Sequence, residues 1–87
     1  MAKWQRKHIS DEAVCLACLI AHTYHQDMTY QIIQKAFPDC PVKVIYAAME
    51  RASYRELIDW GVSLRSAWVT EKGMELLGDW GRWGLNE

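Results

Sequence analysis

The sequence contains no long hydrophobic run. Its longest apolar stretch, AVCLACLIA, stops at His22 and falls well short of the roughly 20 residues that a membrane span needs. The first ten residues, MAKWQRKHIS, are basic but lead into an acidic helix start without a small-residue cleavage site. We therefore expect no membrane partner, no signal peptide and a cytoplasmic location.

Cysteine and net charge are also scarce. Three cysteines, an odd number, argue against a disulfide framework in a reducing compartment. A net charge of -1 gives no overall attraction to nucleic acid, so any affinity for DNA must come from local placement of charge. There is no Gly-rich phosphate loop and no matching arrangement of Ser, His and acid. We therefore expect no enzyme, no catalytic residue and no cofactor.

One stretch, Cys15-x2-Cys18-x3-His22-x2-His25, resembles a zinc site. On a helix the four side chains share a stripe, but ten residues at about 1.5 Å rise span roughly 15 Å. The four ligands of one zinc ion must each lie about 2.0 to 2.3 Å from it. One continuous helix cannot supply all four, so we expect ordinary helix residues and no metal.

The 87 residues, of which 51% are hydrophobic, predict one globular domain over 10–77. A basic arm over 1–9, expected to be loose, precedes the domain, and a Gly- and Trp-containing tail over 78–87 follows it. Capping residues and apolar spacing predict three helices, with Ser10 and Thr29 as N-caps of the first two. The predicted helices cover 10–26, 29–37 and 41–55.

The helical spacing of apolar residues ends in the segment LIDWGVSLRSAWVT, which is rich in aromatic and β-branched residues. It predicts two strands, over 57–62 and 67–69, joined by a short loop. Thr70 is a suitable N-cap for a short fourth helix that ends near Leu77. The predicted class is therefore mainly α with a β-hairpin.

A short helix, a tight turn at FPDC and a longer third helix predict a helix-turn-helix, whose second helix can enter the major groove. A helical wheel places Glu50 and four candidate DNA contacts on its outer face. The candidates are Lys43, Ala47, Arg51 and Tyr54. The alternative is a solvated helix face, which the carboxylate of Glu50 favours.

These residues also carry a resemblance. The segment AAMERASYRELIDWGVSLRSAWVTEKGMELL looks like the recognition helix, wing and last helix of bacterial winged-helix proteins. Their LT.KG wing ending is matched by Val69, Thr70, Lys72 and Gly73. The segment is similar to small winged-helix proteins of temperate phages and prophages, over 10–77 in architecture and 47–73 in sequence.

The resemblance implies a three-helix core with a two-stranded wing that binds duplex DNA in a regulatory or accessory role. It places Arg65 at the wing tip. Dimerisation would double the few phosphate contacts of one chain, and the basic arm could lie along an adjacent groove. The arm contributes Lys3, Arg6 and Lys7.

A second hypothesis is a protein-interaction adaptor that acts on a host or phage protein. The wheel of the first helix places Cys15 and Leu19 on the face opposite its expected core, so they could meet a dimer mate or a partner. Isolated apolar surface residues are also normal. Trp68 either pairs with Trp60 across the hairpin or faces outward with Leu64 as an anchor. The two tail residues Trp80 and Trp83 have the same two interpretations.

Overall fold

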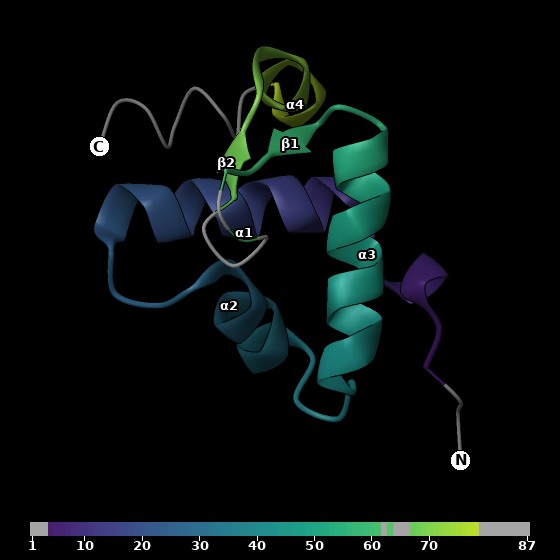
Figure 1. Ribbon diagram of the computed structural model, residues 1–87. Coiled ribbons are helices and arrows are strands. Elements are labelled where there is room, and N and C mark those ends of the chain that lie inside the picture. The colour runs from purple at the N-terminus through teal and green to yellow at the C-terminus, as the bar shows by residue number, and fades with distance from the viewer. Residues whose placement is uncertain (1–3, 62, 64–66, 79–87) are drawn as a thin grey trace.

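The described part of the chain folds into four α-helices and a short antiparallel hairpin (Figure 1). The computed structural model describes residues 4–61, 63 and 67–78. The order is η1 (Arg6–His8), α1 (Asp11–Tyr24), α2 (Thr29–Ala36), α3 (Val42–Tyr54), β1 (Ile58–Asp59), β2 (Trp68–Val69) and α4 (Glu71–Leu77). Of the helices in these ranges, none is long and apolar enough to cross a membrane. The mainly helical class with a hairpin is confirmed.

Local capping explains where the helices begin. The Ser10 hydroxyl accepts a hydrogen bond from the Ala13 amide at 3.0 Å, and the Thr70 hydroxyl accepts one from Gly73 at 3.1 Å, both as predicted. The cap of α2 was predicted one residue too late. Met28 is the N-cap, its amide donating to Gln31 Oε1 at 2.8 Å, while Thr29 is buried as the first helical residue.

The end of α3 turns the chain into the hairpin. Glu56 adopts a left-handed conformation with φ of 64°, and two backbone hydrogen bonds of 3.0 Å close the turn, from Glu56 to Ser53 and from Leu57 to Ala52. This pattern is the Schellman motif, which satisfies the last carbonyls of a helix. It directs Leu57 and Ile58 into the core, where both are buried.

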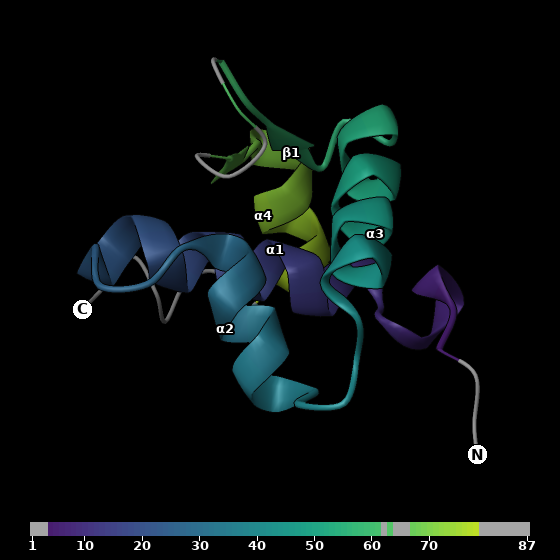
Figure 2. The same cartoon turned by 60° about the horizontal axis from the view of Figure 1, so that its bottom comes forward.

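Helix α1 lies at the centre of the fold, between α2 on one side and α4 with the hairpin on the other (Figure 2). The predicted orientation of α1 was wrong. Cys15 and Leu19, expected to face solvent, are buried, with 0% and 7% of their surface exposed, whereas Tyr24 on the same helix is 56% exposed. The wheel could not choose the face, because α1 is apolar around most of its circumference and is covered from several sides. Cys15 and Leu19 are therefore core residues.

The N-terminal segment from residue 4 onward packs against the domain instead of forming a loose arm. Ile9 is fully buried, and η1 lies against α3. The Trp4 ring meets Phe37 edge-on, with ring centroids 5.8 Å apart. An aromatic and an aliphatic residue thus anchor the segment at its two ends. Lys3 lies outside the described residues.

The hairpin is shorter than predicted, and its two tryptophans are not cross-strand partners. Ile58 pairs with Val69, and Asp59 pairs with Trp68, so Trp60 lies one residue past the ladder. The Trp60 indole instead donates to Ser53 Oγ at 3.2 Å, and Trp68 is 41% exposed. Outward exposure of Trp68 therefore fits better than the predicted aromatic pair, while Leu64 lies outside the described residues.

Gly73 lets α4 approach the start of the hairpin closely. A Cβ at this position would lie 2.1 Å from the Leu57 carbonyl oxygen and 2.7 Å from Val69 Cγ1. That carbonyl already accepts a hydrogen bond from the Thr70 amide at 3.0 Å, so it cannot move aside without breaking the attachment of the hairpin. The glycine of the LT.KG-like ending is thus required by packing.

We expect Gly73→Ala to lower the free energy of unfolding by about 2 to 3 kcal/mol, because the overlap outweighs the roughly 1 kcal/mol that alanine gains in a helix. Urea unfolding followed by circular dichroism measures this loss. Gly61→Ala is the matched control, since its Cβ would lie 3.9 Å from the Trp68 ring, an ordinary contact. Equal stability of the two variants would contradict the close approach.

Candidate nucleic-acid interface

Four residues form one stripe along the outer side of α3. Lys43, Glu50 and Tyr54 are exposed, and Ala47 between them is half-buried. Their spacing of four, three and four residues keeps them on one helical face. Exposure of this face agrees with the helical wheel. We call these four residues the α3 stripe.

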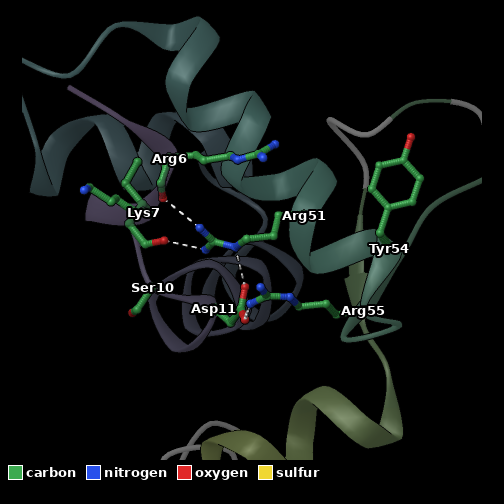
Figure 3. Close-up of a pocket in the computed structure, with 8 residues that line it drawn as sticks. Arg6, Lys7, Ser10, Asp11, Arg51, Tyr54 and Arg55 are labelled. Atoms are coloured by element: carbon green, nitrogen blue, oxygen red, sulfur yellow. Dashed lines mark hydrogen bonds and ion pairs between the residues drawn. The ribbon is translucent and has the colours of Figure 1, made fainter. Parts of the chain in front are cut away.

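Arg51 does not belong to this outward surface, and the prediction that its side chain faces outward from α3 was wrong. Its guanidinium donates to Asp11 Oδ1 at 2.8 Å, to the Arg6 carbonyl at 2.7 Å and to the Ile9 carbonyl (Figure 3). Only 14% of its side chain is exposed. The wheel could not foresee this, because the segment that covers Arg51 lies about forty residues earlier in the chain. Replacing Arg51 therefore damages the fold itself, not a DNA contact alone.

Asp11, in the first turn of α1, is shared by two arginines of α3. One carboxylate oxygen accepts from Arg51, and the other accepts from the guanidinium of Arg55. Burial raises the pKa of Asp11, but the hydrogen bonds and charges of Arg55 and Arg51 together outweigh burial and hold this pKa below its ordinary value of 3.8. Asp11 therefore stays ionised at neutral pH and ties the start of α1 to α3.

A groove of about 540 Å³ opens beside this cluster, between the N-terminal segment and the last turns of α3 (Figure 3). We call it the basic groove. Its lining carries four cationic side chains and a single carboxylate, that of Asp11. The lining residues are Arg6, Lys7, Ile9, Ser10, Asp11, Arg51, Tyr54 and Arg55.

The basic groove has positive charge that the described residues do not fully neutralise. Arg6 and Lys7 are exposed, and within residues 4–61, 63 and 67–78 neither forms a salt bridge. Arg55 is 59% exposed on its side chain although it contacts Asp11. Several cations on one concave surface can hold the phosphates of a nucleic acid.

The structure brings together some of the predicted DNA contacts but not all. Arg6, Lys7 and Tyr54 line the basic groove, whereas Lys43 and Ala47 lie toward the other end of α3. Arg55 was missed. Its position four residues after Arg51, on the same side of the helix, is the signal that could have found it. Three other predicted residues lie outside the described part of the chain: Arg65, Trp80 and Trp83.

The zinc-like stretch of α1 separates into a buried and an exposed half. Cys15 and Cys18 are fully buried, and burial is the main cause that raises their pKa, to about 12 and about 11. His22 and His25 are exposed, with ring centroids 5.8 Å apart. In the described ranges, there is no group of three His, Cys, Asp or Glu side chains that could hold a metal ion. The two thiols, being protonated at neutral pH, are poor metal ligands and poor nucleophiles.

Comparisons with protein families, with curated proteins and with solved structures found no match for this chain.

The lowered pKa of Asp11 predicts a dependence of stability on pH. A carboxyl group with a depressed pKa in the folded state stabilises the protein above its ordinary pKa, and this contribution is lost as pH falls through the folded value. We expect Asp11→Asn to cost about 2 to 4 kcal/mol at about pH 7, because Arg51 keeps its burial but loses its charged partner. The cost should shrink as pH falls toward about 2, because the wild-type carboxylate then begins to take up a proton as well.

Urea unfolding of both proteins at the two pH values measures this cost. Glu12→Gln, which neutralises an exposed carboxylate in the same helical turn, serves as the control and should change stability by less than about 1 kcal/mol. A cost of Asp11→Asn that stays constant with pH would contradict the proposed role of the ionised carboxylate.

Proposed function

We propose that this protein is a winged helix-turn-helix protein that binds duplex DNA. In this proposal α2, the turn at 37–41 and α3 form the helix-turn-helix, and β1 with β2 forms the wing. Two features support it: the order of the elements, and the exposure of the α3 stripe beside the basic groove. The resemblance of residues 47–73 favours a regulatory or accessory role of the kind found in temperate phages and prophages.

The basic groove is the observation that carries the proposal. Arg6, Lys7 and Arg55 would contact phosphates at the end of α3, beside Tyr54, the last residue of the α3 stripe. At the start of α3, Lys43 would reach a phosphate or a guanine, and Ala47 would allow a thymine methyl to approach. Glu50 lowers affinity near phosphates unless it accepts a hydrogen bond from a cytosine amino group.

About three phosphate contacts per chain make the binding weak and dependent on salt. Each contact contributes about -0.9 to the slope of log affinity against log salt, so three contacts imply a loss of about 40-fold between about 50 and 200 mM. Binding of this kind requires low salt, a second copy of the chain or a specific site.

Reversing one charge in the basic groove tests the proposal. We expect Lys7→Glu to weaken binding of a labelled duplex by at least about tenfold at about 50 mM salt, because it removes one phosphate contact and adds repulsion. The salt slope should fall by about one or more. Fluorescence anisotropy at several salt concentrations measures both quantities.

Lys72→Glu provides the matched control, because it makes the same change of charge at an exposed position of α4, outside the groove. Its duplex affinity should stay close to that of the wild type. The DNA-binding proposal would be abandoned if the wild-type protein failed to bind at about 50 mM salt, or if the two variants lost affinity equally.

A second candidate function is a protein contact, and a separate apolar groove favours it. This groove, the Trp68 groove, measures about 300 Å³ and is lined by Leu19, His22, Trp68, Val69 and Met74. Nearby on α4, Leu76 is 41% exposed, as is Trp68 itself. Partly exposed tryptophans beside apolar pockets often anchor interfaces. A second copy of this chain would fit the DNA-binding proposal best, because a dimer doubles the number of basic grooves.

Sedimentation velocity tests this contact. We expect the wild-type protein to dimerise and Trp68→Glu to weaken the dimer by at least about tenfold, since a carboxylate would be buried in an apolar interface. Tyr24→Glu, at an exposed aromatic position outside the Trp68 groove, should leave association unchanged. A monomeric wild-type protein would contradict the homodimer and leave a host or phage protein as the partner of this groove.

A further inference from the structure

Two aromatic side chains are exposed to solvent near the end of α3, and one of them lines the basic groove. Tyr54, which lines the groove, is 85% exposed, the highest value among the large hydrophobic residues that the structure describes. Figure 3 shows its ring at the rim, extending away from the contact between Arg51 and Asp11. Trp60 is 43% exposed, and its indole is held at 3.2 Å by Ser53, the residue before Tyr54. We call Tyr54 and Trp60 the aromatic ledge.

The charges along α3 favour a ligand at this end of the helix. Lys43 and Glu50 are the two charged residues of the α3 stripe and carry opposite charges, so the stripe has no net charge. Positive charge gathers instead around Arg6, Lys7 and Arg55, beside the ledge. A ligand that needs both phosphate contacts and an aromatic face finds both at this groove.

Single-stranded DNA is a ligand of this kind. Proteins that bind single strands combine a positively charged groove for the backbone with aromatic side chains on which unpaired bases stack. The bases of a duplex already stack on one another, so a protruding ring such as that of Tyr54 gains little from them. A ledge that is exposed before any ligand binds also needs no rearrangement to receive a base.

We propose that the aromatic ledge and the basic groove together bind a short single-stranded DNA segment, with one base stacked on Tyr54 and a neighbouring base on Trp60. The proposal rests on the proposed function, in that the basic groove holds nucleic-acid phosphates. It adds a second form of DNA to the ligands of that site. Arg6, Lys7 and Arg55 hold the backbone of either form, and the ledge recognises only the unpaired one.

The experiment compares two labelled probes with the full-length protein at low salt. One is an oligothymidylate of about 12 nucleotides, within the usual size of a single-strand site, and the other is a duplex of the same length. Fluorescence anisotropy gives the affinity for each. We expect Tyr54→Ala to weaken binding of the single strand by about tenfold or more and to weaken duplex binding clearly less, because the duplex can lose only a polar contact of the Tyr54 hydroxyl.

Two further variants separate stacking from other effects. Tyr54→Phe keeps the ring and removes the hydroxyl, so it should retain single-strand affinity. Tyr24→Ala removes a ring that is 56% exposed at the far end of α1 and should change nothing. Circular dichroism and the urea midpoint check that each variant is folded. We expect all of them to fold, because both tyrosines are exposed and contribute little to the core.

The outcomes distinguish this inference from the proposed function. Three outcomes would overturn stacking on Tyr54. Tyr54→Ala could leave single-strand binding intact, or Tyr54→Phe could weaken it as much as Tyr54→Ala does. The third is that Tyr54→Ala weakens single-strand and duplex binding by the same factor. In those cases duplex binding by the basic groove can still stand. Failure of both probes to bind would overturn both proposals, whereas single-strand binding that depends on the Tyr54 ring, without duplex binding, would support the ledge and refute only the duplex.

Discussion

The guanidinium of Arg51 holds the N-terminal segment and the start of α1 against α3, which lies about forty residues later in the sequence. It binds the carboxylate of Asp11 at the start of α1, the carbonyl of Arg6 at the start of η1, and the carbonyl of Ile9 just after η1. Arginine suits this position, because its planar fork of donors can serve several acceptors at once and never loses its charge. The contact draws the N-terminal segment onto α3, and that arrangement creates the basic groove. Residues 6 and 7 owe their place beside Arg55 to a side chain that is itself unavailable to a ligand.

The fold was predictable wherever the signals are local. Ser10 and Thr70 cap their helices as their neighbours in the sequence indicate, and the proline at 38 stands just past the end of α2. The orientation of α1 was not predictable, because a helix that is apolar on most sides becomes oriented only when its neighbours pack. Cys15 and Leu19 were assigned to solvent for this reason, although the hairpin and α4 cover them.

The same distinction applies to the candidate site. Tyr54 and Lys7 are exposed, as a wheel and a basic terminal segment suggest, and within the described residues neither is covered by a distant segment. Arg51 looks the same as Arg55 in the sequence, yet one is buried and the other is exposed. Both lie on the same side of α3, but the N-terminal segment covers Arg51 and leaves Arg55, one helical turn further along, largely exposed. A basic side chain on a helix can therefore be assigned to a ligand only after the structure has shown how much of it remains exposed.

The three buried thiols have a practical consequence for studying the protein in solution. Cys15, Cys18 and Cys40 expose at most 1% of their surface, and burial raises the pKa of each. A thiol-specific reagent can reach them only when the surrounding structure opens. Cys40 lies in the turn before α3, whereas the other two lie on the central helix. Reaction of Cys40 with such a reagent thus reports on local opening of the turn, and reaction of Cys15 and Cys18 reports on opening of the core, without any engineered probe.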